Sequence, residues 1–536
     1  MPDRGQRPRG RPQRLPFDDV AATDTALDGQ KRLAWLLTTA RVMGATPNRV
    51  DFVEKLRAAG IRADSSRISR WESGLEPLPP HLVGAYECAA GVPHMLLTAA
   101  RRLLYRGGHL PDRLELRPST AVHTAAELDG LLDQVQRHSM TGAEWLQLSE
   151  LLSSFEHVYL PVRSWRSMAD LLVSELARSI GLAYLRRCEA AISMLRLPIA
   201  QPHLSAGIAR FALEPGAQLT ARVLPALGLL GTGAGDLLVH MVQNQDAQVR
   251  AAASRAASST WLGRRDPLGD TEEPDPDSVQ PFVVDLLRTH RTSARSTLTT
   301  VTLDLTCRLP EEHFTRALQA VTSRSEQARL LRARETRELV SASTARQISD
   351  RIATQAEAAL DRQSHDPDLM LRQLLREALF HVHRDRRIIA TGLIIASPYS
   401  RAVAAATLGH TTHEAPEVAC AAWSLTARLA GATDDADLFA AALEERRPAA
   451  QMAVMAALAQ TRRPLEEALA TRVATAAVSD IPGMAPAAVT CLGMHRRMDL
   501  MPDATAAPAV REAVRWWRAN PGALHEDHVG FTAPAV

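Results

Sequence analysis

The amino-acid sequence predicts an all-α protein with two parts, a small N-terminal helical bundle and a much longer helical body. Leucine and alanine recur at three- and four-residue spacing along most of the 536 residues, and aromatic residues make up only 4% of the chain. No convincing series of alternating strands appears. The length also exceeds what one small domain needs, so we expect at least one further large domain with an ample core.

The stretch from Asp64 to Gly74 predicts one short helix with two different faces. Asp64 is a suitable N-cap because its carboxylate can accept hydrogen bonds from first-turn amides, and Gly74 stands where a left-handed residue ends a helix. At about 100° per residue, Ile68 and Trp71 fall on one side. The opposite side is polar and carries Ser66, Ser69, Arg70 and Ser73.

This polar face has the size and the chemistry to enter the major groove of DNA. Small serine side chains would let the helix backbone approach a groove about 12 Å wide, while Arg70 reaches a guanine edge or a phosphate. The alternative interpretation is an ordinary surface helix that is used for protein contacts.

The segments on either side predict four more helices and so complete a five-helix unit. The first spans Lys31 to Met43, and the last two span Leu82 to Ala90 and His94 to Leu104. For the second helix, Thr46 is the predicted cap and Pro47 the first helical residue. Its predicted inward side chains and its end are Val50, Val53, Leu56 and Gly60.

The tract from Ile68 to Gly74, followed by Leu82 to Glu87, resembles the Cro/C1-type (XRE) helix-turn-helix regulators of actinobacteria over roughly residues 31–106. The resemblance implies a sequence-specific transcriptional regulator that binds double-stranded DNA, often as a homodimer on half-sites about one DNA turn apart. We therefore expect a helix-turn-helix domain over residues 25–108, with no catalytic residues and no cofactor.

The resemblance also implies roles for individual residues. The base-reading positions of the family fall on Ser65, Ser66 and Arg70. Glu72 takes the place of an inward acid that usually pairs with an arginine of the first helix. Arg41 is the candidate partner, although it stands one residue from the expected position.

The chain departs from the family pattern at the second helix and at the turn after it. Pro47 and Asn48 replace the glutamine that commonly opens this helix, and the turn from Gly60 to Ala63 is about two residues longer than is usual in the family. The resemblance then implies DNA-backbone contacts from Asn48, Arg49, Arg62, Arg67 and Ser69. It gives structural roles to Ile68, Trp71, Glu72 and Gly74.

Charge is distributed unevenly along the chain. Residues 1–110 carry 17 Lys and Arg against 11 Asp and Glu, and the remainder carries 45 against 49. Residues 1–24 are rich in Arg, Pro, Gly and Gln, which predicts a disordered basic arm. Such an arm could follow the DNA backbone or enter a minor groove, or it could be a simple soluble tail.

Beyond residue 108 the sequence predicts helices almost throughout. Residues 109–266 and 282–536 are expected to form two helical lobes on either side of an acidic, proline-rich loop at 267–281. Thr297 to Thr306 has a weak strand pattern, but the neighbouring segments favour a helix there.

Internal repetition near the C-terminus predicts an α-solenoid of helical pairs. First helices are expected near Arg401, Asp434 and Leu465, and second helices near Pro416, Pro448 and Gly483. The tract from Asp246 to Ala252 resembles the second helix of a HEAT repeat. Tetratricopeptide-like pairs and a non-repetitive helical bundle remain alternatives.

Several patterns with possible chemistry favour structural roles. The glycine-rich tract Gly228–Asp236 lacks the lysine of a phosphate-binding loop, so an inter-helix turn is expected. His410, His413 and Glu414, with His381 and His383, would need to converge to bind a metal, and no metal site is expected. A shared helix face of Cys491 and His495 favours a core position.

The cysteines and the two adjacent tryptophans carry further expectations. Five dispersed cysteines, at positions 88, 188, 307, 420 and 491, indicate reduced, buried thiols in a cytoplasmic protein. The expected DNA binding would make this protein nucleoid-associated. Trp516 and Trp517 favour a capping helix, and the alternative is that one indole packs inward while the other makes an exposed contact.

Three functions remain open from the sequence. The first is a DNA-binding regulator whose helical body mediates self-association or receives a signal. The second is a protein-interaction scaffold that uses the N-terminal unit for docking, and the third is a regulator that senses a small ligand or peptide on the helical array. The sequence has no secretory signal and no apolar run long enough to span a bilayer, so no membrane partner is expected.

Overall fold

The described part of the chain is helical throughout, which confirms the predicted all-α class. The structure is a computed structural model that describes residues 15–18, 27–106, 125–155, 157–229, 241, 283, 300–360, 366–429, 448–481, 483–502 and 506–526. Within these residues it contains twenty-three α-helices, three short 3-10 helices and no strand.

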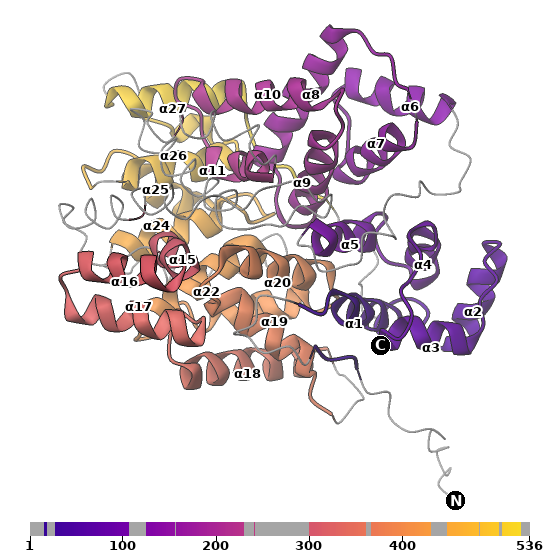
Figure 1. Ribbon diagram of the computed structural model, residues 1–536. Helices are drawn as coiled ribbons and strands as arrows, with labels where there is room; N and C mark the ends of the chain where they lie inside the picture. The colour runs from indigo at the N-terminus through magenta and orange to yellow at the C-terminus, as the bar shows by residue number, and fades with distance from the viewer. Residues whose placement is uncertain are drawn as a thin grey trace, which may run out of the picture.

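Five α-helices and one 3-10 helix form the N-terminal bundle at the lower right of Figure 1. They are α1 (Gly29–Val42), α2 (Arg49–Ala58), α3 (Ser65–Ser73), η1 (Pro80–Leu82), α4 (Val83–Ala90) and α5 (Leu96–Arg106). The number and order of α-helices match the prediction. Helix α5 begins two residues later than predicted, because Met95 has a left-handed φ of 60°.

The predicted start of the second helix is wrong. Asn48, and not Thr46, is the N-cap of α2, and its Oδ1 accepts a hydrogen bond from the Val50 amide at 2.9 Å. Thr46 is buried, and its hydroxyl instead accepts a hydrogen bond from Lys55. Val50, predicted to face inward, is 60% exposed, and Phe52 fills the core beside Val53 and Leu56.

The chain continues into a group of helices at the upper right of Figure 1. They are α6 (Ala125–Gln136), α7 (Gly142–Ser154), α8 (Val162–Arg178), α9 (Gly181–Leu195), α10 (Gln201–Leu213), α11 (Thr220–Val223) and η3 (Leu224–Leu229). Helix α9 packs against α7, α8, α10 and α5, so it joins this group to the N-terminal bundle.

The remaining helices form the left and centre of the molecule. The first eight are α15 (Thr300–Arg308), α16 (Glu311–Ala320), α17 (Arg324–Thr336), α18 (Ala342–Ala359), α19 (Leu369–Phe380), α20 (Arg384–Ala396), α21 (Ser400–Leu408) and α22 (Pro416–Leu429). The last five are α24 (Pro448–Leu458), α25 (Glu467–Ala476), α26 (Met484–Met494), η5 (Met498–Leu500) and α27 (Pro508–Ala519). Helix α15 confirms the helical interpretation for the part of Thr297–Thr306 that the structure describes.

Helices begin close to five of the six positions predicted from the repeats. Helices α21, α22, α24, α25 and α26 begin at residues 400, 416, 448, 467 and 484. Helix α22 packs on α24 and α24 on α26, so the predicted second helices stack in a row, and α26 also packs on α27. The assignment of these pairs to HEAT-like or tetratricopeptide-like repeats stays a prediction.

Some sequence predictions lie outside the described residues. They concern the arm up to residue 14, most of the glycine-rich tract Gly228–Asp236, the tract Asp246–Ala252, the acidic loop 267–281 and the helix expected near Asp434.

Helix α27 lies at the upper left of Figure 1, beside α10, which comes much earlier in the chain. The rings of Trp516 and Phe211 meet edge to face at 5.8 Å, and Trp516 Nε1 donates to Glu214 at 3.3 Å. Both Trp516 and Trp517 are buried, so the alternative with one exposed indole is wrong. Helix α27 therefore brings the end of the helical body into contact with helix α10 near its beginning.

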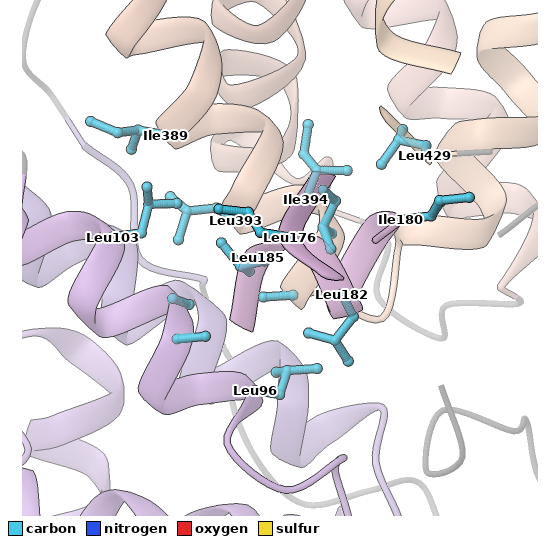
Figure 2. Close-up of a cluster of buried hydrophobic side chains, with 14 of the residues drawn as sticks. Leu96, Leu103, Leu176, Ile180, Leu182, Leu185, Ile389, Leu393, Ile394 and Leu429 are labelled. Atoms are coloured by element: carbon cyan, nitrogen blue, oxygen red, sulfur yellow. The ribbon is translucent and has the colours of Figure 1, made fainter. Parts of the chain in front are cut away.

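One continuous hydrophobic core links the bundle with the helices before and after the predicted acidic loop. Figure 2 shows its centre, where α5, α8, α9, α20 and α22 contribute side chains. Gly392 of α20 faces Leu103 of α5 so closely that a Cβ would lie 2.2 Å from Leu103 Cδ2. The two lobes predicted at 109–266 and 282–536 therefore do not have separate cores. A smaller second cluster belongs to α15, α16 and α17.

Buried polar residues of helix α1 make hydrogen bonds and an ion pair with residues of the body. Arg32 forms a two-pronged ion pair with Glu377 of α19, at 2.7 and 2.6 Å. Trp35 donates from Nε1 to Asp368 at 3.0 Å and stacks on Tyr399. Burial alone would raise the pKa of Glu377, but the charge and hydrogen bonds of Arg32 bring it down to about 2.

The prediction of a disordered arm over residues 1–24 is wrong at Asp18. Its side chain is fully buried, and its Oδ2 accepts from Arg32 Nε at 2.7 Å. This end of the predicted arm is therefore a structural part of the α1 junction.

The thiol prediction is correct only in part. None of the five cysteines forms a disulfide, but Cys88 and Cys420 are exposed and Cys188 is half-buried, which leaves Cys307 and Cys491 in the core. Among the described residues no single helix has the length and apolar composition of a membrane span. The bent pair of α20 and α21 passes such a test only together, across an angle of 118°.

Replacing Arg32 with Met should lower the free energy of unfolding by about 3–5 kcal/mol, because it leaves the buried Glu377 carboxylate short of its main partner. Urea unfolding measures the change. The matched control is Arg137→Met, which removes an exposed ion pair with Asp133 at 3.6 Å and should cost less than about 1 kcal/mol. Equal losses in the two variants would contradict the role of Arg32.

Candidate nucleic-acid interface

Helix α3 begins and ends at the residues that the sequence predicts. Asp64 Oδ1 accepts a hydrogen bond from the Arg67 amide at 2.7 Å, which satisfies one free donor of the first turn. Gly74 ends the helix with a φ of 72°, a conformation that residues with a side chain rarely adopt. These two caps fix which side chains of α3 face outward.

The predicted two-faced character of α3 is confirmed. Ile68 and Trp71 are buried in the core of the bundle, whereas Ser65, Ser66 and Arg70 are exposed on the other side. Ser69 and Ser73 are half-buried at the edges of this surface. The structure thus brings the three predicted base-reading residues together on one exposed helix face, which we call the α3 face.

Glu76 lies beside the α3 face and was missed by the sequence analysis. Its carboxylate lies 3.4 Å from Arg70 Nε and 3.7 Å from Arg67 Nε. Arg67 also lies over the ring of Trp71, with its Cζ 5.4 Å from the ring centre. Both arginines remain substantially exposed, so the acid orients them without removing them from solvent.

Glu72 lies beneath the α3 face and joins four helices of the bundle. Its carboxylate accepts hydrogen bonds from Nε and Nη2 of Arg41 in α1, which confirms the predicted pair. Arg49 of α2 and the hydroxyl of Tyr86 in α4 also reach Glu72, at 2.9 and 3.0 Å. One buried carboxylate thereby sets the positions of α1, α2 and α4 around α3.

The electrostatics of this cluster follow from its burial and its charges. Burial alone would lower the pKa of Arg41, but its hydrogen bonds and charge interaction with Glu72 raise that pKa above its ordinary value. Burial raises the pKa of Tyr86 well above its usual value, and the negative Glu72 raises it further. The phenol therefore stays a hydrogen-bond donor at neutral pH.

The predicted backbone-contact residues occupy different environments. Asn48 is exposed but uses its side-chain oxygen to cap α2, and Arg62 is exposed in the turn before α3. Arg49 is 32% exposed and already paired with Glu72, so its main contact lies within the bundle. Arg67 and Ser69 lie on α3 itself.

Helix α3, which carries the α3 face, lies at the edge of the described part of the molecule. In Figure 1, α2 and α3 form the outer corner of the bundle, whereas α1 and α5 lie between them and the body. Of the bundle helices, α5 packs against α9 and α20. The helices that anchor the bundle are thus different from the helix that carries the α3 face.

A second buried acid, Glu87, fixes the junction between α4 and α5. It accepts hydrogen bonds from the amides of Met95 and Thr98, at 2.8 and 2.9 Å. Burial nevertheless raises the pKa of Glu87 to about 7, because it outweighs these hydrogen bonds and the charge of Arg186. The nearby His94 is held neutral, since burial and then Arg186 lower its pKa.

The described residues offer no alternative chemical centre at the other predicted positions. They contain no group of three or more His, Cys, Asp and Glu side chains placed to hold a metal ion. His383 bonds to Asp304, and His413 accepts from the Ala415 amide. Cys491 lies in the core as predicted, and His495 Nε2 contacts the Leu458 carbonyl oxygen at 2.7 Å.

Comparisons of this chain with protein-family models, with curated proteins and with solved structures found no match.

The raised pKa of Glu87 predicts a specific pH dependence of stability. The neutral acid is favoured in the folded state, so its contribution is fully present below about pH 4.3 and is lost as the pH rises through about 7. Glu87→Gln imitates the neutral acid at every pH. Between pH 5 and 8 the variant should therefore gain about 2–4 kcal/mol in unfolding free energy relative to the wild type.

Urea unfolding at several pH values tests this. A difference between variant and wild type that stays constant from pH 5 to 8 would mean that the amides of Met95 and Thr98 keep Glu87 ionised throughout.

Proposed function

We propose that this protein is a sequence-specific DNA-binding transcriptional regulator that reads double-stranded DNA with the α3 face. The observation that carries the proposal is the exposure of Ser65, Ser66 and Arg70 together on one side of a well-capped helix, the other side of which is buried. A helix with small polar side chains and one long guanidinium fits the major groove and its hydrogen-bonding edges.

The position of the α3 face supports the same proposal. It lies at an outer corner of the molecule, and the described body helices lie on the far side of α1 and α5. Arg62 and Asn48 are exposed at the ends of the turn and helix that precede it, where phosphates beside a groove would lie. Arg70 and the serines would then read bases, and the flanking residues would position the DNA backbone.

The body would fix the geometry of binding and not the base preference. The bundle shares one core with the body, so a homodimer formed through the body would hold two α3 faces at a set distance. We propose that this spacing selects paired half-sites. The body would also be the part that receives a signal or a partner.

Arg70→Ala should weaken binding to a specific site by about 1–3 kcal/mol and relax the preference at one base pair, because a bidentate base contact is lost. Sites are first identified by genome-wide mapping, and affinity is then measured by fluorescence anisotropy on the best site and on a scrambled duplex. Arg137→Ala, which removes an exposed arginine of similar charge away from α3, is the control. Equal weakening of Arg70→Ala on both duplexes would instead mark a phosphate contact.

Glu76→Gln should strengthen binding to any duplex several-fold at low salt, because it removes the acid that pairs with Arg67 and Arg70 and competes with phosphates. The slope of log affinity against log salt concentration should steepen by up to about 1. Glu54→Gln is a matched control, since it removes an exposed acid of α2 and changes the net charge equally. If the control variant gains as much affinity, the effect belongs to total charge and not to the α3 face.

A further inference from the structure

Four arginine side chains of the helical body lie close together, next to Tyr184 of α9. They are Arg222 of α11, Arg384 and Arg387 of α20, and Arg428 of α22. Arg222 lies over the Tyr184 ring, with its Cζ 5.1 Å from the ring centre. Helix α20 packs against both α9 and α22, and all four arginines are half-buried. We call these four residues the arginine cluster.

The hydrogen bonds of the arginine cluster go to neutral groups or are missing. Arg222 donates to the Ala177 carbonyl and to the Gln460 side chain, at 3.2 and 3.0 Å. Arg387 donates to the backbone oxygens of His381 and Val382. Arg384 Nη1 is buried without a hydrogen-bond partner. Within the described part of the chain, the side chain of Arg428 makes no hydrogen bond.

The nearby carboxylates do not neutralise this charge. Asp304 and Asp385 both pair with a fifth arginine, Arg308, at 2.7 and 2.5 Å. Asp304 also accepts from His383, which burial keeps neutral by lowering its pKa. Five guanidinium groups thus face two carboxylates among the described residues, which leaves a surplus of three positive charges.

The arrangement is unfavourable without a counter-charge. Burial, followed by the repulsion of neighbouring arginines, lowers the pKa of Arg428 to about 10. Burial and Arg384 lower the pKa of Arg387 to about 10, even though Asp304 and Asp385 act in the opposite direction. Both groups remain charged at neutral pH, so the described part of the body has a concentrated positive potential at this place.

We propose that the arginine cluster is a binding site for a small polyanion that carries phosphate groups. Planar guanidinium groups match the geometry of phosphate oxygens, and a ligand with two or three negative charges would offset most or all of the surplus of three. The site is half-buried between α9, α11, α20 and α22, which favours a small molecule over a duplex. The inference does not depend on the proposed DNA binding, because the cluster and the α3 face have no residue in common.

The test measures binding of inorganic pyrophosphate and triphosphate to the full-length protein, by calorimetry and by thermal unfolding at constant ionic strength. The wild type should bind and show a higher Tm with either anion. Arg428→Gln and Arg387→Gln should each lose at least tenfold in affinity. Arg137→Gln, which removes an exposed arginine of α6's C-terminal end, should bind as the wild type does. No binding by the wild type, or an equal loss in Arg137→Gln, would overturn the proposal.

A second measurement separates a ligand site from a structural role. Without anion, Arg428→Gln should have the same Tm as the wild type or a higher one, because one of several like charges is removed. A structural ion pair would give a lower Tm, and that result would overturn the proposal. Affinity for duplex DNA should be unchanged in this variant, and a parallel loss of DNA binding would assign the cluster to DNA instead.

A third measurement tests whether acidic residues of the chain itself already neutralise the arginine cluster. A variant in which Asp270, Glu272, Glu273, Asp275 and Asp277 are replaced by their amides should bind pyrophosphate with unchanged affinity. If its affinity rises tenfold or more, those acids already act as the counter-charge and the proposal fails. A nucleoside triphosphate is compared with inorganic triphosphate in the same assay, and tighter binding of the nucleotide would identify the source of the phosphate as a nucleotide.

Discussion

The ion pair between Arg32 and Glu377 determines how the two parts of this protein are related. Both side chains are buried, and they lie 345 residues apart in sequence. A buried pair tolerates little displacement, since separating the charges leaves each without solvent. Together with Trp35 on Asp368, it places one side of α1 against the body while the other side completes the bundle core. The bundle is consequently an extension of the body and not a module on a linker.

Features of α3 could be predicted because their causes are local. Asp64 and Gly74 act within one turn of the helix, and the burial of Ile68 and Trp71 follows from helical periodicity. Local signals failed where two of them competed. Thr46 and Asn48 are both good caps two residues apart, and α2 begins after Asn48, with Phe52 in the core and Val50 facing solvent.

Contacts between distant segments could not be predicted, because no periodic pattern marks them. Nothing in the composition of residues 1–24 singles out Asp18 as the buried partner of Arg32. Glu76 follows the end of α3, and only the path of the chain after Gly74 brings it to Arg67 and Arg70. The arginine cluster likewise comes from three segments of the chain. The extent of the common core has the same origin, since leucine spacing indicates a helix face but not its partner.

The arginines of α3 and those of the arginine cluster have different environments. This difference explains why DNA is proposed as the ligand of the first group and a small anion as the ligand of the second. On α3 the guanidiniums are exposed and share one acid, so an extended polyanion can reach them at small desolvation cost. In the body they are half-buried with a surplus of charge, which suits a compact anion. Helix α20 connects the arginine cluster with the bundle at α5, which packs against α1, and α1 in turn packs against α3. Arg384 and Arg387 stand in its first turn, and Gly392, further along the same helix, lies directly against Leu103 of α5. Anion binding that shifted α20 would therefore act on the bundle, and by linkage DNA would change the affinity for the anion by the same factor.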